Sequence, residues 1–156
     1  WKNIAIVGDV LHSRVALSNI YALNKLGAKV MVCGPMSLIP KHIESLGVIV
    51  EKDLVKALRW CDAVNMLRVQ NERMNFNYFP TTREYSQLYR LDSSIIKLVN
   101  KPITVLHPGP INRGVEISSE IADSENAIIL DQVENGVAVR MAVIYLLSLK
   151  FKNWFD

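Results

Sequence analysis

The chain has 156 residues, of which 50% are apolar and 21% charged, and its net charge is +3. A folded chain of 17.6 kDa exposes about 7,900 Å² and buries roughly 69% of its extended surface, which is ample for one core. Two full domains would not fit, so we expect residues 1–156 to form a single domain. The composition excludes a disordered or collagen-like chain, and the mild charge gives no reason to expect a nucleic-acid partner.

The two cysteines and the longest apolar run indicate where the protein works. Cys33 and Cys61 fall in apolar, strand-like runs, which predicts free buried thiols in a reducing cytoplasm and neither a disulfide framework nor a metal site. The apolar run 141–149 is about half as long as a membrane span, and we expect no signal peptide before the first strand. Because the chain begins with Trp1 and enters a strand almost at once, we expect it to be a piece of something longer.

Short apolar runs closed by Gly or Pro alternate with helical patterns along the chain. Strands are predicted at 3–7, 28–33, 48–50, 63–67 and 103–106, and helices at 13–26, 41–46, 54–60, 82–88, 93–99 and 132–149, with a short helix before the last one. Residues 71–80 are polar and aperiodic, which predicts a loop. This alternation predicts an α/β fold, a Rossmann-like three-layer domain with a five-stranded parallel sheet flanked by helices.

The last predicted helix is apolar on nearly every side. Val, Ile, Leu and Met residues point all round its axis between 133 and 149. Such a helix has to be buried on more than one side. A domain of this size has little material to cover the outer face, so the sequence predicts a missing partner, either another domain or another subunit.

Ligands of open parallel sheets bind beyond the carboxyl ends of the strands, and the end of the first strand carries polar residues. Gly8 permits a tight turn, and Arg14 lies in the first turn of the next helix. A carboxylate there would meet a guanidinium and free backbone N–H groups. The alternative is that Gly8 is only a turn and that Arg14 pairs with Asp9.

The end of the fourth strand carries Arg68 and Gln70, which face the same way in extended chain. An arginine can clamp a carboxylate at two points, and a glutamine can pair with an ammonium group or an oxygen. The alternative is a solvated loop in which Arg68 pairs with Glu72.

The end of the fifth strand is the turn His107-Pro108-Gly109-Pro110. Its prolines stiffen the backbone and leave rigid carbonyls to accept hydrogen bonds from a ligand amide, unless the segment is only a stiff turn. The chain has no dinucleotide or Walker glycine motif, no metal-ligand spacing among its histidines and no evident acidic pair. Arginines, a glutamine and a carbonyl turn suit the binding of an amino acid with two carboxylates better than acid–base chemistry.

Four segments match one family in sequence order. They are Gly8-Asp9-x-x-His12-Ser13-Arg14-Val15-Ala16-x-Ser18-Asn19, Cys33-Gly34-Pro35, Met66-Leu67-Arg68-x-Gln70-x-Glu72-Arg73 and His107-Pro108-Gly109-Pro110-x-Asn112-Arg113-Gly114-Val115-Glu116-Ile117. Together they resemble the aspartate carbamoyltransferases, over about residues 3–149. Only the C-terminal, aspartate-binding half is matched, because nothing here resembles the family's N-terminal Ser-Thr-Arg-Thr signature for carbamoyl phosphate.

The resemblance implies transfer of the carbamoyl group of carbamoyl phosphate to the amine of L-aspartate, in pyrimidine synthesis. It implies that Arg14 holds the α-carboxylate of aspartate and Arg68 its side-chain carboxylate, with Gln70 helping to orient it. The carbonyls of residues 108–109, in a turn shaped by Pro110, would receive the carbamoyl NH₂. Members of the family need no metal or organic cofactor and form trimers whose sites borrow residues from the neighbouring subunit. Neither nucleic acid nor a membrane is an expected partner.

The related ornithine carbamoyltransferases are disfavoured. Their Ser-Met-Gly loop is absent, Pro108 stands where they typically have Cys, and two arginines fit two carboxylates better than a cationic side chain. This sequence also departs from many aspartate relatives at Leu17 and in the loop 75–78. We expect the chain to supply no catalytic group and to be inactive or nearly so alone. The alternative is a non-enzymatic amino-acid-binding or scaffolding module, and an oxidoreductase domain is disfavoured by the missing glycine fingerprint.

Overall fold

The structure is a computed structural model that describes residues 2–69 and 81–152. Its strands are β1 (Asn3–Val7), β2 (Lys29–Cys33), β3 (Ile49–Glu51), β4 (Ala63–Met66) and β5 (Thr104–Leu106). Its helices are α1 (Arg14–Lys25), α2 (Leu54–Trp60), α3 (Thr82–Tyr89), α4 (Ser93–Val99), α5 (Ser119–Ala122) and α6 (Ile129–Lys152), with 3₁₀ turns η1 (Met36–Leu38) and η2 (Ile43–Leu46). The predicted loop 71–80 and Gln70 lie outside the described residues.

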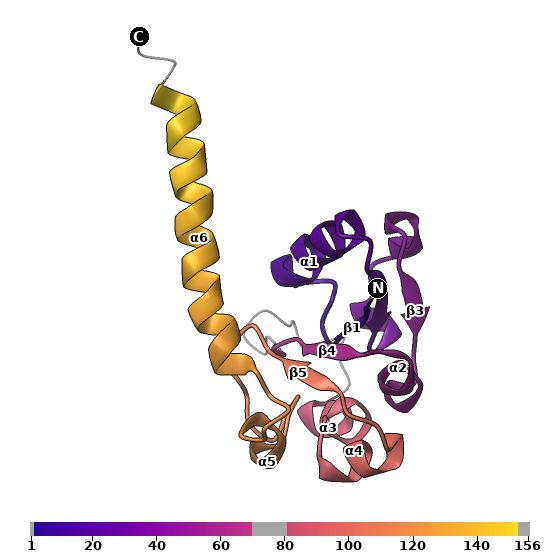
Figure 1. Ribbon diagram of the computed structural model, residues 1–156. Coiled ribbons are helices and arrows are strands. Elements are labelled where there is room, and N and C mark those ends of the chain that lie inside the picture. Colours follow the sequence, from indigo (N-terminus) through magenta and orange to yellow (C-terminus); the bar gives the residue numbers. More distant parts are fainter. Residues whose placement is uncertain (1, 70–80, 153–156) are drawn as a thin grey trace.

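The sheet has the order β3-β2-β1-β4-β5, and every pair of neighbouring strands is parallel. The chain first builds outward from β1 to β3 and then returns to the other side of β1, so the order reverses between β1 and β4 (Figure 1). At that central position Val7 is paired with Cys33 on one side and Met66 on the other. The predicted α/β fold with a five-stranded parallel sheet is confirmed.

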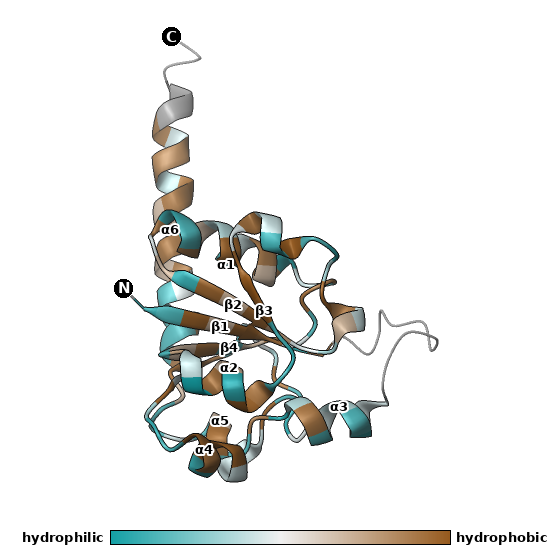
Figure 2. Cartoon of the chain, turned by 90° about the vertical axis from the view of Figure 1, so that its right-hand side faces the viewer, coloured by the Kyte–Doolittle hydropathy of each residue, from teal (hydrophilic) through white to brown (hydrophobic). Residues whose placement is uncertain are grey.

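Alternate residues of β1 face two different apolar layers. Ala5 and Val7 belong to a cluster with Leu58 of α2, whereas Ile6 belongs to a second cluster with Ile20 of α1. All five side chains are fully buried. Because successive residues of a strand point to opposite faces, β1 is buried on both sides, as the strands of parallel sheets are. The result is the predicted three-layer arrangement, with α1 on one face of the sheet and α2 on the other (Figure 2).

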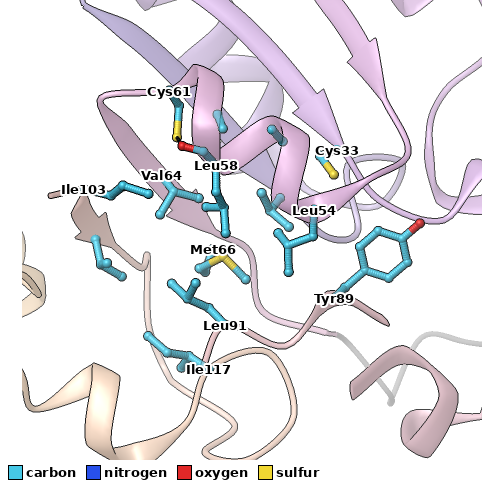
Figure 3. Packing of buried hydrophobic residues seen from close by; sticks show 14 of the residues in the cluster. Cys33, Leu54, Leu58, Cys61, Val64, Met66, Tyr89, Leu91, Ile103 and Ile117 are labelled. Carbon is cyan, nitrogen blue, oxygen red and sulfur yellow. Dashed lines mark hydrogen bonds between the residues drawn. The ribbon is translucent and has the colours of Figure 1, made fainter. Parts of the chain in front are cut away.

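The larger cluster extends from the sheet into the second half of the chain. Leu58 of α2, Met66 of β4, and Leu91 and Ile117 from later segments lie together there (Figure 3), and all four are fully buried. Leu91 also bridges Ile117 through the backbone. The segment that follows β5 is thereby fixed to the core.

Capping groups explain most of the helix ends. The Ser13 side chain accepts the N–H of Ala16 and begins α1, and the hydroxyl of Thr81 forms a capping box with Glu84 at the start of α3. The predicted helix 41–46 is wrong in part, since only the 3₁₀ turn η2 forms there. His42 (φ 63°) and Gly47 (φ 77°) are both left-handed, which leaves too few helical residues for an α-helix.

Helix α6 begins three residues earlier than predicted, at Ile129, and extends away from the sheet (Figure 1). Val139, Met141, Ile144 and Leu146 on different sides of it are all between 62% and 66% exposed. The chain exposes 10279 Å² in total, well above the roughly 7,900 Å² of a compact chain of its mass. The prediction of an apolar helix without a cover is confirmed (Figure 2).

Candidate binding site at the carboxyl edge of the sheet

The carboxyl ends of β1, β4 and β5 lie at one edge of the sheet because these neighbouring strands are parallel. The residues predicted to bind a ligand follow these three ends: Arg14 after β1, Arg68 after β4, and Pro108–Pro110 after β5. The reversal of strand order between β1 and β4 is where sheets of this kind leave a crevice for ligands. The described site residues therefore belong to one edge, whereas the position of Gln70 is outside the described ranges.

Gly8 brings the loops after β1 and β4 into close contact. Its φ of 127° is unfavourable for any other residue, and an added Cβ would lie 3.0 Å from the Tyr85 hydroxyl and 3.2 Å from Cβ of Leu67. The Leu67 N–H donates to the carbonyl of Val7 at 2.8 Å, which extends the pairing of the two strands. Gly8 thus forms the tight turn that the sequence predicts, and its missing side chain also lets Leu67 and Tyr85 lie against the backbone there.

Arg14 is the first residue of α1 and is exposed. The alternative partner proposed for it, Asp9, is buried and instead accepts the backbone N–H of His12 at 3.1 Å and contacts the Nδ1 atom of its ring at 3.0 Å. The first turn of α1 contains no acidic residue. A guanidinium and a helix N-terminus therefore favour an anion at this place.

Arg68 is half-buried between two anchored neighbours. Leu67 is bonded to β1, and the carbonyl of the buried Val69 accepts the side-chain N–H of Asn112 at 3.0 Å. This bond joins the segment after β4 to the segment after β5. The alternative pairing of Arg68 with Glu72 concerns a residue outside the described ranges.

The turn after β5 is held from below by buried side chains. Gly109 (φ 65°) donates its N–H to Nδ1 of His107 at 2.9 Å, and the Gly109–Pro110 peptide is cis. Nε2 of His107 lies 3.1 Å from Oε1 of Glu116, and this oxygen also accepts the Asn112 N–H at 2.7 Å. These hydrogen bonds to buried side chains restrain the turn in addition to its two prolines.

Sequence reasoning assigned no role to His107, Asn112 or Glu116. A signal was present, because the carboxylate of Glu116 stands between the apolar Val115 and Ile117, where a solvated charge is not expected. Only the fold shows that the carboxylate faces His107, nine residues earlier.

Tyr85 lies under the same edge and is fully buried. Burial, and then the nearby carboxylates of Glu116 and Asp9, raise the pKa of its hydroxyl well above the usual range. The side chain therefore stays a neutral phenol under Gly8.

Within residues 2–69 and 81–152, no three His, Cys, Asp or Glu side chains lie close enough together to hold a metal ion. No helix of these ranges has the length and apolarity to cross a membrane.

A groove of about 660 Å³ lies between the turn after β5 and α6, and Pro108, Gln132 and Arg140 are among its lining residues. One side of the turn thus faces the uncovered helix.

The strand order, with its reversal between β1 and β4, and the close approach of the loops at Gly8 define a Rossmann-like α/β domain, with Arg14 and Arg68 at the carboxyl edge of its sheet. Residues 2–147 match the family model described as aspartate/ornithine carbamoyltransferase, Asp/Orn binding domain. The chain belongs to this family, as its four motifs suggested.

The curated relatives that it matches are twice as long. The aspartate carbamoyltransferase catalytic subunit of Flavobacterium psychrophilum is 68% identical over 151 residues, covering 97% of this chain and 49% of the relative. The protein of the same name from Christiangramia forsetii is 66% identical over 152 residues, with shares of 97% and 49%. The chain therefore spans about half the length of these relatives.

Solved structures agree on the fold. The catalytic subunit of M. jannaschii aspartate transcarbamoylase is 29% identical, with a TM-score of 0.71 over 92% of this chain and 47% of that one. The ornithine carbamoyltransferase from Pyrococcus furiosus, 24% identical, has a TM-score of 0.74 over 92% and 48%. The second likeness is one of fold alone.

Proposed function

We propose that this chain is the aspartate-binding half of an aspartate carbamoyltransferase. The complete protein would transfer the carbamoyl group of carbamoyl phosphate to the amine of L-aspartate, giving N-carbamoyl-L-aspartate and phosphate in pyrimidine synthesis. The observation that carries the proposal is the 68% identity to a catalytic subunit of that name, across nearly the whole chain. The positions of Arg14 and Arg68, which follow two neighbouring strands at one edge of the sheet, support it independently.

The proposed roles follow from the chemistry of the site. Arg14, at a helix N-terminus, binds the α-carboxylate of aspartate, and Arg68 binds the side-chain carboxylate with help from Gln70. Two cations for two carboxylates fix the amine in one orientation. The carbonyls of residues 108–109 accept the NH₂ of the carbamoyl group, in the turn that Pro110 completes.

The reaction then depends mainly on placement. The amine attacks the carbamoyl carbon, a C–N bond forms, the C–O bond to phosphate breaks, and the proton lost by the amine passes to the departing phosphate. Holding the two reactants at attack distance supplies much of the acceleration. The charge of the departing phosphate has to be stabilised by groups outside this chain.

The partner that we propose is the carbamoyl-phosphate-binding half of the same protein. It would cover the apolar surface of α6, and the chain's length, about half that of the relatives, leaves room for it. We further propose that the complete protein is a cytoplasmic homotrimer that needs no cofactor. Two buried free thiols suit a reducing compartment.

Complementation tests the proposal. Formation of N-carbamoyl-L-aspartate is measured with this chain alone and with a carbamoyl-phosphate-binding half added. Activity only in the mixture is expected. Activity of the chain alone would overturn the division of the site, and silence of two halves that demonstrably associate would favour the non-enzymatic binding or scaffolding module.

The role of Arg68 has a direct test in the complete enzyme. Arg68→Ala should raise the KM for aspartate about 10- to 150-fold, because hydrogen bonds to a charged group contribute about 1.5–3 kcal/mol, while binding of carbamoyl phosphate changes little. Arg59→Ala is the matched control, since Arg59 lies in the last turn of α2, which leads to the start of β4 at the opposite edge of the sheet, and donates to the Leu98 carbonyl. An unchanged aspartate KM in Arg68→Ala would refute the assignment.

A further inference from the structure

Under the turn after β5, the structure buries a histidine and a carboxylate side by side. The side chains of His107 and Glu116 are both 0% exposed, and Nε2 of the ring is 3.1 Å from Oε1 of the carboxylate. Burying such groups costs several kcal/mol unless they are hydrogen-bonded, and apolar residues of similar size would stabilise the core as well or better. The pair therefore calls for an explanation other than stability.

The hydrogen bonds fix where the proton lies. A backbone N–H can only donate, so the bond from Gly109 to Nδ1 makes that ring nitrogen an acceptor. The ring proton is consequently on Nε2 and is donated to Glu116. Since the Asn112 N–H donates to the same carboxylate oxygen at 2.7 Å, both ends of the turn are tied to one buried pair.

A further bond extends this unit to the arginine segment. Nδ2 of Asn112 donates to the carbonyl of Val69 at 3.0 Å, and Val69 directly follows Arg68. In the proposed function, the turn accepts the carbamoyl group and Arg68 holds aspartate. The same network therefore sets the position of both reactants.

We propose that His107 and Glu116 are positioning residues for carbamoyl transfer. They do not touch substrate. They hold the carbonyls of the 108–110 turn and, through Asn112, the Arg68 segment in one fixed relation. This inference rests on the proposed function and adds to it a pair of residues that act from beneath the site.

The test uses the complete catalytic chain and variants that separate positioning from folding. His107→Gln keeps a donor near the position of Nε2, so Glu116 stays bonded, but its amide oxygen is one bond further along the side chain than Nδ1 and does not replace the acceptor of the Gly109 N–H. Glu116→Gln keeps an acceptor oxygen for both His107 and Asn112, whereas Glu116→Ala keeps none. Val30→Ala is the control for lost stability, because Val30 is buried in the other apolar cluster and lies near the amino end of β2, at the opposite edge of the sheet.

Misplacement of a reacting group by about 1 Å can cost about 100-fold in rate. We expect kcat to fall at least about tenfold in His107→Gln and Glu116→Ala, with an aspartate KM within about threefold of wild type. Glu116→Gln should recover most of kcat, and Val30→Ala should lower the unfolding midpoint while keeping kcat.

The outcomes separate this inference from the proposed function. Two results would overturn the positioning role alone, provided that the wild type is active. One is a His107→Gln variant that keeps the wild-type kcat, and the other is a Glu116→Gln variant that is as slow as Glu116→Ala. A complete wild-type chain that forms no N-carbamoyl-L-aspartate would overturn the proposed function and the positioning role with it.

Discussion

The loops after β1 and β2 approach each other so closely at Gly34 that a methyl group does not fit. A Cβ added to Gly34 would lie 2.5 Å from the carbonyl oxygen of Gly8, whereas real Cβ contacts stay beyond 3.0 Å. That oxygen belongs to the backbone and accepts the Val10 N–H at 3.1 Å, and the Gly8 N–H donates to Cys33 at 2.8 Å. The Gly8 peptide is thus held on both sides, so Gly34→Ala has to displace a strand end.

The size of the effect follows from the contact. Forcing an extra carbon into a packed site costs about 1–3 kcal/mol, and occasionally more. Because the obstacle at Gly34 is backbone at the centre of the sheet, we expect the upper end, about 3 kcal/mol. In a chain of this length each kcal/mol lowers the unfolding midpoint by about 2–4 °C, which gives a fall of about 6–12 °C.

The assay is thermal unfolding followed by far-UV circular dichroism, with Gly136→Ala as the matched control. A Cβ at Gly136 in α6 meets no atom within 4 Å. The same substitution there should stabilise the helix by about 0.5–1 kcal/mol. A Gly34→Ala midpoint within about 2 °C of wild type would refute the reasoning, because it would mean that the loops separate at little cost.

Two other predictions concern titratable groups. Burial raises the thiol pKa of Cys33 to about 12 and that of Cys61 to about 11. Neither thiol should therefore react with a thiol reagent at pH 8 until the chain is unfolded. Rapid reaction of the folded chain would contradict this prediction. Burial works to raise the pKa of Asp92, but hydrogen bonds from Ser94 and Arg90 outweigh it and leave the pKa below 3.8. The stability that Asp92 provides is therefore present above the unfolded pKa and lost as pH falls through the folded value. Asp92→Ala should cost about 1 kcal/mol at pH 7, and a difference from wild type that persisted unchanged in strong acid would be inconsistent with this linkage.

The local features of this fold can be predicted from the sequence. The strand at 3–7, the helices at 54–60 and 93–99 and the thiols of Cys33 and Cys61 are found where the sequence predicts them. Each is determined by residues close together in the chain: apolar runs, capping side chains and glycines that stop helices. The exception is the segment 41–46, where a left-handed His42 shortens the helix and no side-chain pattern announces it.

The site was only partly predictable, because it depends on contacts between residues that are far apart in the chain. The rule that ligands bind at strand ends identified Arg14, Arg68 and the 108–110 turn, because the rule needs only the order of elements. Their roles toward a ligand stay predictions.

The tertiary structure alone decided which strand ends are neighbours and what lies beneath them. The approach of Gly34 to Gly8 and the pairing of His107 with Glu116 join residues that are distant in the chain or separated by a turn. Such contacts depend on how the strands are ordered in the sheet, a property of the whole chain's packing. By itself, the sequence determined the elements, the family resemblance and the need for a cover over the last helix. The strand order then determined how a buried pair could support the edge where a ligand would bind.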